Sequence, residues 1–215
     1  MPIADLCSRA FLAAAESAVD LLSEPNVGAR WTQPSALADF SVGGLAAHLA
    51  RAVLNTREVL IAPAAQAPPI TVFEHYRRSA WNGSDPESAA NQGIRQTGER
   101  AASDGPGSVL AQVRRALDVV RTELADPRTG RPVFLPWAGW SLTRDDFLLT
   151  RMVELVVHAD DLAVSIGIPA VVPPDEPLQL VIDLLARLAM YEHGPLAVLR
   201  TLSRAKRAPK SISAL

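Results

Sequence analysis

Apolar residues recur every three to four positions in five long stretches of the chain, covering residues 4–23, 42–61, 108–124, 144–166 and 178–200. This helical period predicts amphipathic helices. Ser108 is the expected N-cap of the third helix, and Pro195 is expected to kink or divide the last one. The segment 72–103 has weaker helical patterns, and residues 133–135 favour a short extended piece. No alternating run exceeds a few residues, so we expect an all-α protein with a four-helix core and an additional C-terminal helix.

The stretch Arg144–Ile166 is apolar nearly all the way round, which is typical of a helix at the centre of a bundle. Thr143 is the expected N-cap, and Asp145 and Asp146 place negative charge in the first turn, where the helix dipole favours it. Gly167 can adopt the left-handed conformation that ends a helix. Both ends of this helix are therefore predicted from local signals.

Glu154 and His158 lie four residues apart within this stretch, and so on one face of the predicted helix. A buried carboxylate is costly unless its charge is compensated, and a divalent metal ion is one such compensation. The two side chains can equally hydrogen-bond each other, because this spacing alone is not specific for a metal. His48, on the apolar face of the helix at 42–61, is either a third ligand or an ordinary core histidine. If the two helices are neighbours, two imidazoles and one carboxylate converge and leave a coordination position open, as in catalytic zinc sites.

Asp161 lies one turn after His158 and has two possible roles. It can orient the imidazole of His158. Alternatively, Asp160 and Asp161 can pair with Arg151 or with the loops, and the sequence favours these ion pairs.

Trp137 and Trp140 belong to a loop rich in Pro, Gly and Trp that leads directly into the helix with Glu154. Their position makes the two indoles candidates for the wall of a cofactor-binding pocket. Loop tryptophans can equally cover the end of a bundle.

The composition indicates a globular protein and argues against a nucleic-acid-binding or membrane-spanning one. Hydrophobic residues make up 48% and charged residues 20% of the chain, as in ordinary globular proteins, and the net charge of −2 gives no electrostatic footprint for nucleic acid. Cys7 is the only cysteine, so no intrachain disulfide can form, which fits a reducing cytosol. The first residues lack the pattern of a signal peptide, and no apolar run is long enough to span a bilayer. We therefore expect a cytoplasmic protein without a membrane or nucleic-acid partner.

Three segments resemble a known family. They are a helix ending in AAHLAR that follows a Trp-x-x-Pro-Ser loop (Trp31, Pro34, Ser35), the later run LLTRMVELVVHADDLAVSIG, and the closing run HGPLAVLRTLSRAKRAPKSISAL. These segments are similar to the DinB-like, mycothiol-dependent maleylpyruvate isomerase family. The resemblance covers most of the chain and is firmest at residues 31–58 and 133–167.

The resemblance implies a DinB-like metal-binding helical bundle over residues 1–167, with a Pro-rich connection, helix and tail packed on it over 168–215. It implies that His48, Glu154 and His158 bind one divalent ion, with zinc expected. The family's activity uses mycothiol, whose thiolate adds to a small electrophile, so the implied function is an isomerase or S-transferase. Family isomerases also have a substantial α/β C-terminal domain that helps to bind the substrate dicarboxylate. Only residues 168–215 follow here, so the resemblance implies the metal site but does not imply the same substrate.

Other functions stay open from the sequence. A non-catalytic bundle that binds a small ligand or a partner, with a structural metal or none, is the alternative from a different class. A metal-dependent hydrolase that uses bound water is a further one. Monomer and homodimer are both compatible with the sequence.

Overall fold

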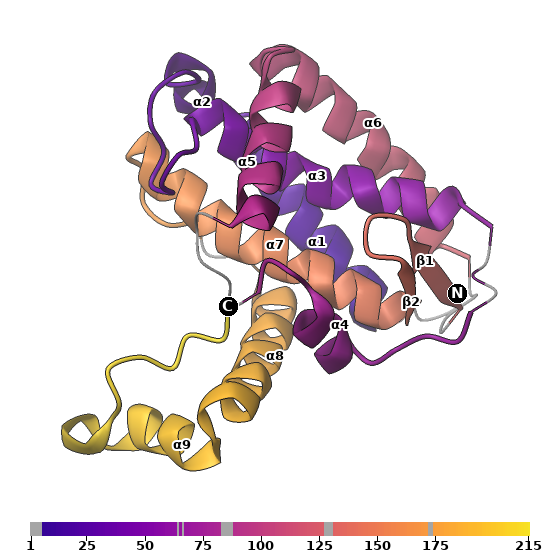
Figure 1. The fold of residues 1–215 in the computed structure, drawn as a ribbon. Coiled ribbons are helices and arrows are strands. Elements are labelled where there is room, and N and C mark those ends of the chain that lie inside the picture. Colours follow the sequence, from indigo (N-terminus) through magenta and orange to yellow (C-terminus); the bar gives the residue numbers. More distant parts are fainter. Residues whose placement is uncertain (1–5, 64, 66, 83–87, 127–130, 172–173) are drawn as a thin grey trace.

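A computed structural model describes residues 6–63, 65, 67–82, 88–126, 131–171 and 174–215. Nearly all regular structure in this part of the chain is helical, which confirms the all-α, DinB-like prediction (Figure 1). The helices are α1 (Leu6–Leu22), α2 (Pro25–Ala29), α3 (Val42–Ile61), α4 (Val72–Arg78), α5 (Ala89–Ala102), α6 (Pro106–Leu124), α7 (Arg144–Ile166), α8 (Asp175–His193) and α9 (Pro195–Ser203), with a 3-10 turn η1 (Ala205–Arg207). None of the helices described here has the length and hydropathy to cross a membrane.

Helices α1, α3, α6 and α7 form the bundle. Helix α3 packs against α5, α6 and α7, and α1 packs against α6 and α7. Helix α7 supplies half of the largest fully buried side chains described: Phe147, Leu148, Met152, Leu155, Leu162 and Ile166. The prediction of a central helix from its nearly unbroken apolar surface is confirmed.

Local capping signals set the ends of the helices that carry the candidate site. The Thr143 hydroxyl accepts the amide N–H of Asp146 at 3.1 Å, and Gly167 ends α7 in the left-handed conformation with φ of 70°. Ser41 caps α3 by accepting the amide N–H of Gly44 at 2.8 Å. These contacts satisfy backbone donors that the first turn of a helix leaves unpaired.

The start of one helix differs from the sequence prediction. Helix α6 begins at Pro106, after Gly105 with φ of 81°, rather than after Ser108. A proline at the first helical position loses no hydrogen bond, and its fixed φ already suits a helix. The expected kink or division at Pro195 is a division: the last stretch is two helices, because Gly194 has φ of 81° and Pro195 starts α9. The expected start of the first helix at residue 4 lies outside the described residues.

A two-stranded antiparallel hairpin precedes α7. Strand β1 (Pro132–Leu135) pairs with β2 (Trp140–Thr143), with Val133 opposite Leu142. This confirms the short extended piece at residues 133–135. The hairpin leads directly into α7 and so fixes where that helix begins.

Helix α5 approaches α3 closely through two glycines. A Cβ atom added at Gly98 would lie 2.8 Å from the carbonyl oxygen of Gly44. The carboxylate of Glu99 accepts the amide N–H of Ser41 at 2.8 Å and its hydroxyl at 2.9 Å. Helix α5 is thus held against the N-terminal half of α3, where it forms one wall of the site described below.

The C-terminal part of the chain lies partly outside the bundle. Helix α8 packs on α1 and α7, whereas α9 extends away from the bundle and contacts α8 and η1. After η1 the chain turns back, and the C-terminus lies close to the bundle again (Figure 1). Nε2 of His193 lies 2.7 Å from the carbonyl oxygen of Ser213, which connects the end of α8 with the returning tail.

Candidate metal centre

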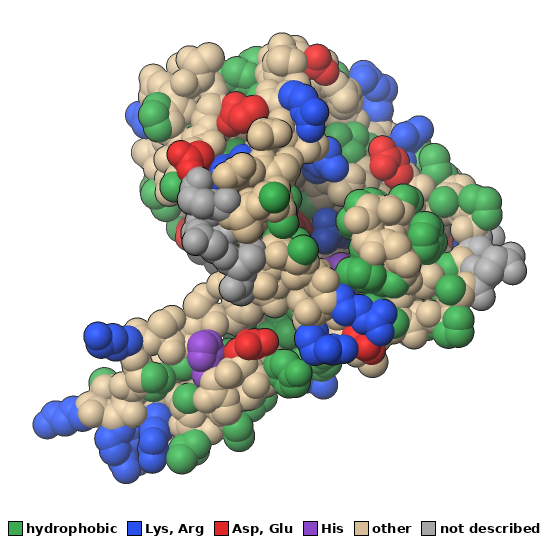
Figure 2. Space-filling view, in the orientation of Figure 1, with side chains coloured by type: hydrophobic (Ala, Val, Ile, Leu, Met, Phe, Trp, Pro, Cys, Tyr) green, Lys and Arg blue, Asp and Glu red, His purple; other side chains and the backbone are tan. Residues whose placement is uncertain are grey.

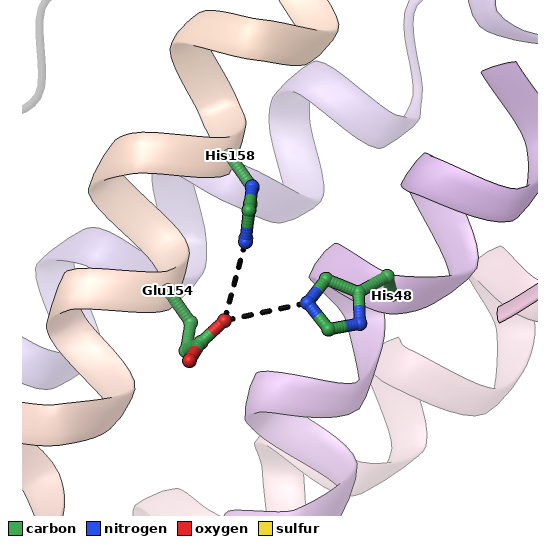
Figure 3. Close-up of side chains that lie close together, drawn as sticks. All are labelled: His48, Glu154 and His158. Atoms are coloured by element: carbon green, nitrogen blue, oxygen red, sulfur yellow. Dashed lines mark ion pairs between the residues drawn. The ribbon is translucent and has the colours of Figure 1, made fainter. Parts of the chain in front are cut away.

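Three side chains predicted as ligands converge between α3 and α7. Nε2 of His48 lies 3.3 Å from Oε2 of Glu154, and Nε2 of His158 lies 3.3 Å from the same oxygen. Figure 3 shows both imidazoles directed at this carboxylate, one from each helix. One ligand atom from each residue lies within 4.8 Å of the other two. The structure therefore brings His48, Glu154 and His158 together as one triad.

The triad lies at the edge of the core rather than at its centre. Its side chains are 18%, 20% and 21% exposed for His48, Glu154 and His158. Leu45 and Leu49 on α3 and Leu155 on α7 are fully buried beside it. The triad therefore has buried apolar side chains on its inner side, and its outer side is open to a small ligand.

Asp161 orients His158. Its Oδ2 lies 2.9 Å from Nδ1 of the imidazole. An ionised carboxylate only accepts hydrogen bonds, so Nδ1 is the donor and Nε2 is the atom that faces Glu154. Of the two roles expected for Asp161, the structure shows the contact with His158 that orients the imidazole.

The expected pairing of Arg151 with Asp160 or Asp161 is wrong. Nine or ten residues along one helix separate these side chains by about 14 to 15 Å. Arg151 instead lies 3.8 Å from Oε1 of Glu154, with its guanidinium 5.8 Å from the ring centroid of Phe147. Arg151 therefore holds the Glu154 oxygen that the histidines do not face.

Electrostatics make the triad favourable for a cation. Burial alone would raise the pKa of Glu154, but hydrogen bonds from His158 and His48 and the charge of Arg151 hold it well below its ordinary value. Burial alone would lower the pKa of His158, but its bonds to Asp161 and Glu154 raise it to about 9. A neutral His158 that donates from Nδ1 presents a lone pair to the Glu154 oxygen. A proton or a metal ion must therefore lie between these two acceptors.

The donor set fits a zinc-like ion. Imidazole nitrogen and carboxylate oxygen are ordinary zinc ligands, with bonds of roughly 2.0 to 2.2 Å. A tetrahedral ion with such bonds separates its ligand atoms by about 3.3 to 3.4 Å. Both nitrogen–oxygen separations at Glu154 are 3.3 Å and match this spacing, while the three ligand atoms together lie within 4.8 Å of one another.

Two cavities adjoin the triad and share His48, Glu154, Trp81 and Ile94 in their linings. Figure 2 shows a hollow in this face of the molecule, with histidine and Lys or Arg side chains visible inside it. We call the cavity of about 340 Å³ the polar lobe; Arg51, Asn55, Thr97, Trp137 and Arg151 also line it.

We call the second cavity, of about 460 Å³, the apolar lobe. Its further lining includes Leu37, Phe40, Val153, Val157 and His158. Leu215, from the returning C-terminal tail, also lines it. The triad therefore faces two spaces of different chemistry.

The two candidate pocket tryptophans lie in different places. Trp137, in the turn of the hairpin, lines the polar lobe. Trp140, in β2, lines neither lobe, and its indole N–H instead donates to Nδ1 of His75 at 3.1 Å. His75 is buried, and this burial together with the charge of Arg151 lowers its pKa to about 4.

Sequence reasoning missed Arg51 and Arg151 as walls of the site, and missed the buried His75. Arg151 had a usable signal, because it is a cation one turn before Glu154 on an otherwise apolar helix. His75 lies in the weakly patterned segment 72–103, where no signal indicated burial.

A family model described as the mycothiol maleylpyruvate isomerase N-terminal domain matches residues 11–163, a span that contains the triad. Among solved structures, the crystal structure of the mycothiol-dependent maleylpyruvate isomerase matches with a TM-score of 0.52 at 17% identity, covering 86% of this chain and 70% of that one. A histidine-to-alanine mutant of that isomerase matches with a TM-score of 0.49 at 16% identity and the same coverage. At such identity the likeness shows the fold alone. No curated protein matches the sequence.

Proposed function

The chain belongs to the family defined by the mycothiol maleylpyruvate isomerase N-terminal domain, and from this premise we propose that it is a metal- and mycothiol-dependent enzyme. Its reaction is the isomerisation of a small electrophile or the transfer of the thiol onto it. The observation that carries the proposal is the convergence of His48, Glu154 and His158 beside two cavities.

In this proposal His48, Glu154 and His158 hold one divalent ion, with zinc expected from the donor set. A bound zinc ion acts as a Lewis acid that lowers the pKa of a thiol and so favours the nucleophilic thiolate. Two neutral imidazoles and one carboxylate compensate only one of the two charges of such an ion. The site therefore favours an anionic ligand.

The remaining residues position these ligands. Asp161 keeps the Nδ1 proton of His158 in place, which leaves Nε2 free to donate its lone pair. Arg151 holds Oε1 of Glu154 and leaves Oε2 to face the imidazoles. Glu154 and His158 are thus each held by a partner beside the site, and such support helps to keep a ligand in the geometry that a metal needs.

The proposed reaction needs no external oxidant or reductant. The sulfur of the thiolate bonds to one carbon of a conjugated double bond, and the displaced electron pair moves to the conjugated carbonyl oxygen. Rotation about the resulting single bond and loss of the thiolate give the other geometric isomer. If a proton adds to the neighbouring carbon instead, the thioether is the product. Cys7 of α1 lines neither lobe, which supports the added thiol as the nucleophile.

We also propose that residues 1–167 are the metal-binding unit and that residues 168–215 are an appendage packed on it. The contacts of α8 with α1 and α7 support this division. The returning tail adds Leu215 to the apolar lobe, so the appendage contributes to the shape of the site.

A direct assay tests the function. The purified protein is loaded with zinc and incubated with mycothiol and a panel of conjugated carbonyl compounds, with and without a strong chelator. We expect isomer or thioether formation that needs both the thiol and the metal. Turnover that is unaffected by the chelator, or equal without the thiol, would contradict the proposal.

A further inference from the structure

The two lobes beside the triad offer different partners to a ligand. Arg51 and Asn55 line only the polar lobe, and within the described part of the chain their side chains have no hydrogen-bond or ion-pair partner. Arg151 adds a second guanidinium, and Trp137 adds an aromatic ring. A guanidinium has five donors and no acceptor, so this wall suits a ligand rich in oxygen acceptors.

The apolar lobe lacks such donors over most of its surface. Leu37, Phe40, Val153 and Val157 line it on the side of His158. Among the described residues of its lining, Arg95 is the one arginine and lies 3.9 Å from the carboxylate of Asp39, and Asn91 has a partner of its own. An isolated carboxylate transferred into such surroundings loses its hydration without compensation.

The co-substrates of the proposed reaction differ in the same way. Mycothiol carries its cysteine on an aminosugar joined to inositol, which gives it many hydroxyl groups and no carboxylate. Guanidinium and amide groups donate to such hydroxyls, and a sugar ring can stack on an indole. An uncharged, apolar electrophile instead gains from burial against aliphatic and aromatic walls.

We propose that the polar lobe binds the sugar–inositol part of mycothiol and that the apolar lobe binds an uncharged, apolar, conjugated carbonyl compound rather than a dicarboxylate. This inference rests on the proposed function, since it assigns the two co-substrates of that reaction. Both lobes include His48 and Glu154, so ligands in the two spaces meet at the triad. The volume of the apolar lobe lies within the range of small-molecule sites, roughly 300 to 1,000 Å³.

The test measures binding separately from turnover. Calorimetry on the zinc-loaded protein gives the affinities for mycothiol, for benzylideneacetone as the apolar probe, and for maleylpyruvate as the dicarboxylate. Leu37→Glu places a negative charge in the apolar lobe at a half-buried loop position. Arg51→Ala removes a donor from the polar lobe. The two variants change opposite lobes and serve as controls for each other.

We expect benzylideneacetone to bind more tightly than maleylpyruvate. Leu37→Glu should weaken the binding of benzylideneacetone by about tenfold or more and leave the affinity for mycothiol unchanged. Arg51→Ala should weaken the binding of mycothiol and leave the affinity for benzylideneacetone unchanged. If maleylpyruvate binds more tightly and Arg51→Ala abolishes that binding, the polar lobe is a carboxylate site and the inference is wrong, although the proposed function stands. If mycothiol does not bind and no substrate turns over, the proposed function fails. In that case the benzylideneacetone measurement still decides whether the apolar lobe is a site.

Discussion

Asp161→Asn tests whether the contact behind His158 supports metal binding. Oδ2 of Asp161 lies 2.9 Å from Nδ1 of the imidazole, and the substitution keeps the shape of the side chain while removing its charge. Loss of such a partner behind a metal ligand typically weakens metal affinity by about 10- to 100-fold. This corresponds to about 1.4 to 2.7 kcal/mol of binding free energy. Competition for zinc against a chromogenic chelator at fixed pH measures the difference.

Asp160→Asn is the matched control. Asp160 is the preceding residue, carries the same charge and is exposed. Its substitution should change the zinc affinity by less than about 0.5 kcal/mol. Equal losses in both variants would indicate a general charge effect, and an unchanged affinity in Asp161→Asn would refute the orienting role.

Three further predictions concern stability and mechanism. In the metal-free protein the pKa of His158, raised from 6.5 to about 9, should stabilise the fold by about 3 kcal/mol below pH 6.5, and this stability should be lost as the pH rises through 9. Urea unfolding of wild type and His158→Gln tests this, and equal slopes against pH would contradict it. Gly98→Ala should destabilise the fold, because its Cβ would lie 2.8 Å from a carbonyl oxygen of α3. Gly93→Ala, with nothing within 4 Å, should instead stabilise by up to about 1 kcal/mol, and thermal unfolding that ranked the two variants the other way would refute this contact. Cys7→Ala should keep mycothiol-dependent turnover and Glu154→Ala should lose it; the opposite result in the same assay would exclude the added thiol as nucleophile.

Much of the bundle could be predicted because its signals are local. Thr143 and Gly167 mark the two ends of α7 in the structure, as the sequence predicts. The apolar surface of α7 indicated its central position. The start of α6 was missed although Gly105 and Pro106 also carry a local signal, because Ser108 is itself a favoured N-cap residue.

The triad was within reach of sequence reasoning, whereas its surroundings were not. A four-residue spacing places Glu154 and His158 together on any helix, and His48 needed only that α3 be a neighbour. The partner of Arg151 depends on the direction of a long side chain, and the direction of Trp140 depends on how the hairpin pairs. The close approach of α5 to α3 depends on Gly98 having no side chain, which no periodic pattern reveals.

The central claim is that His48, Glu154 and His158 together bind one divalent ion. Elemental analysis after zinc loading and exhaustive dialysis measures this directly, in wild type and in the variant with all three residues changed to alanine. Circular dichroism of both proteins checks that the helical fold is kept. We predict one equivalent of zinc per wild-type chain and none in the folded triple variant. Equal zinc content in the two proteins would contradict the claim.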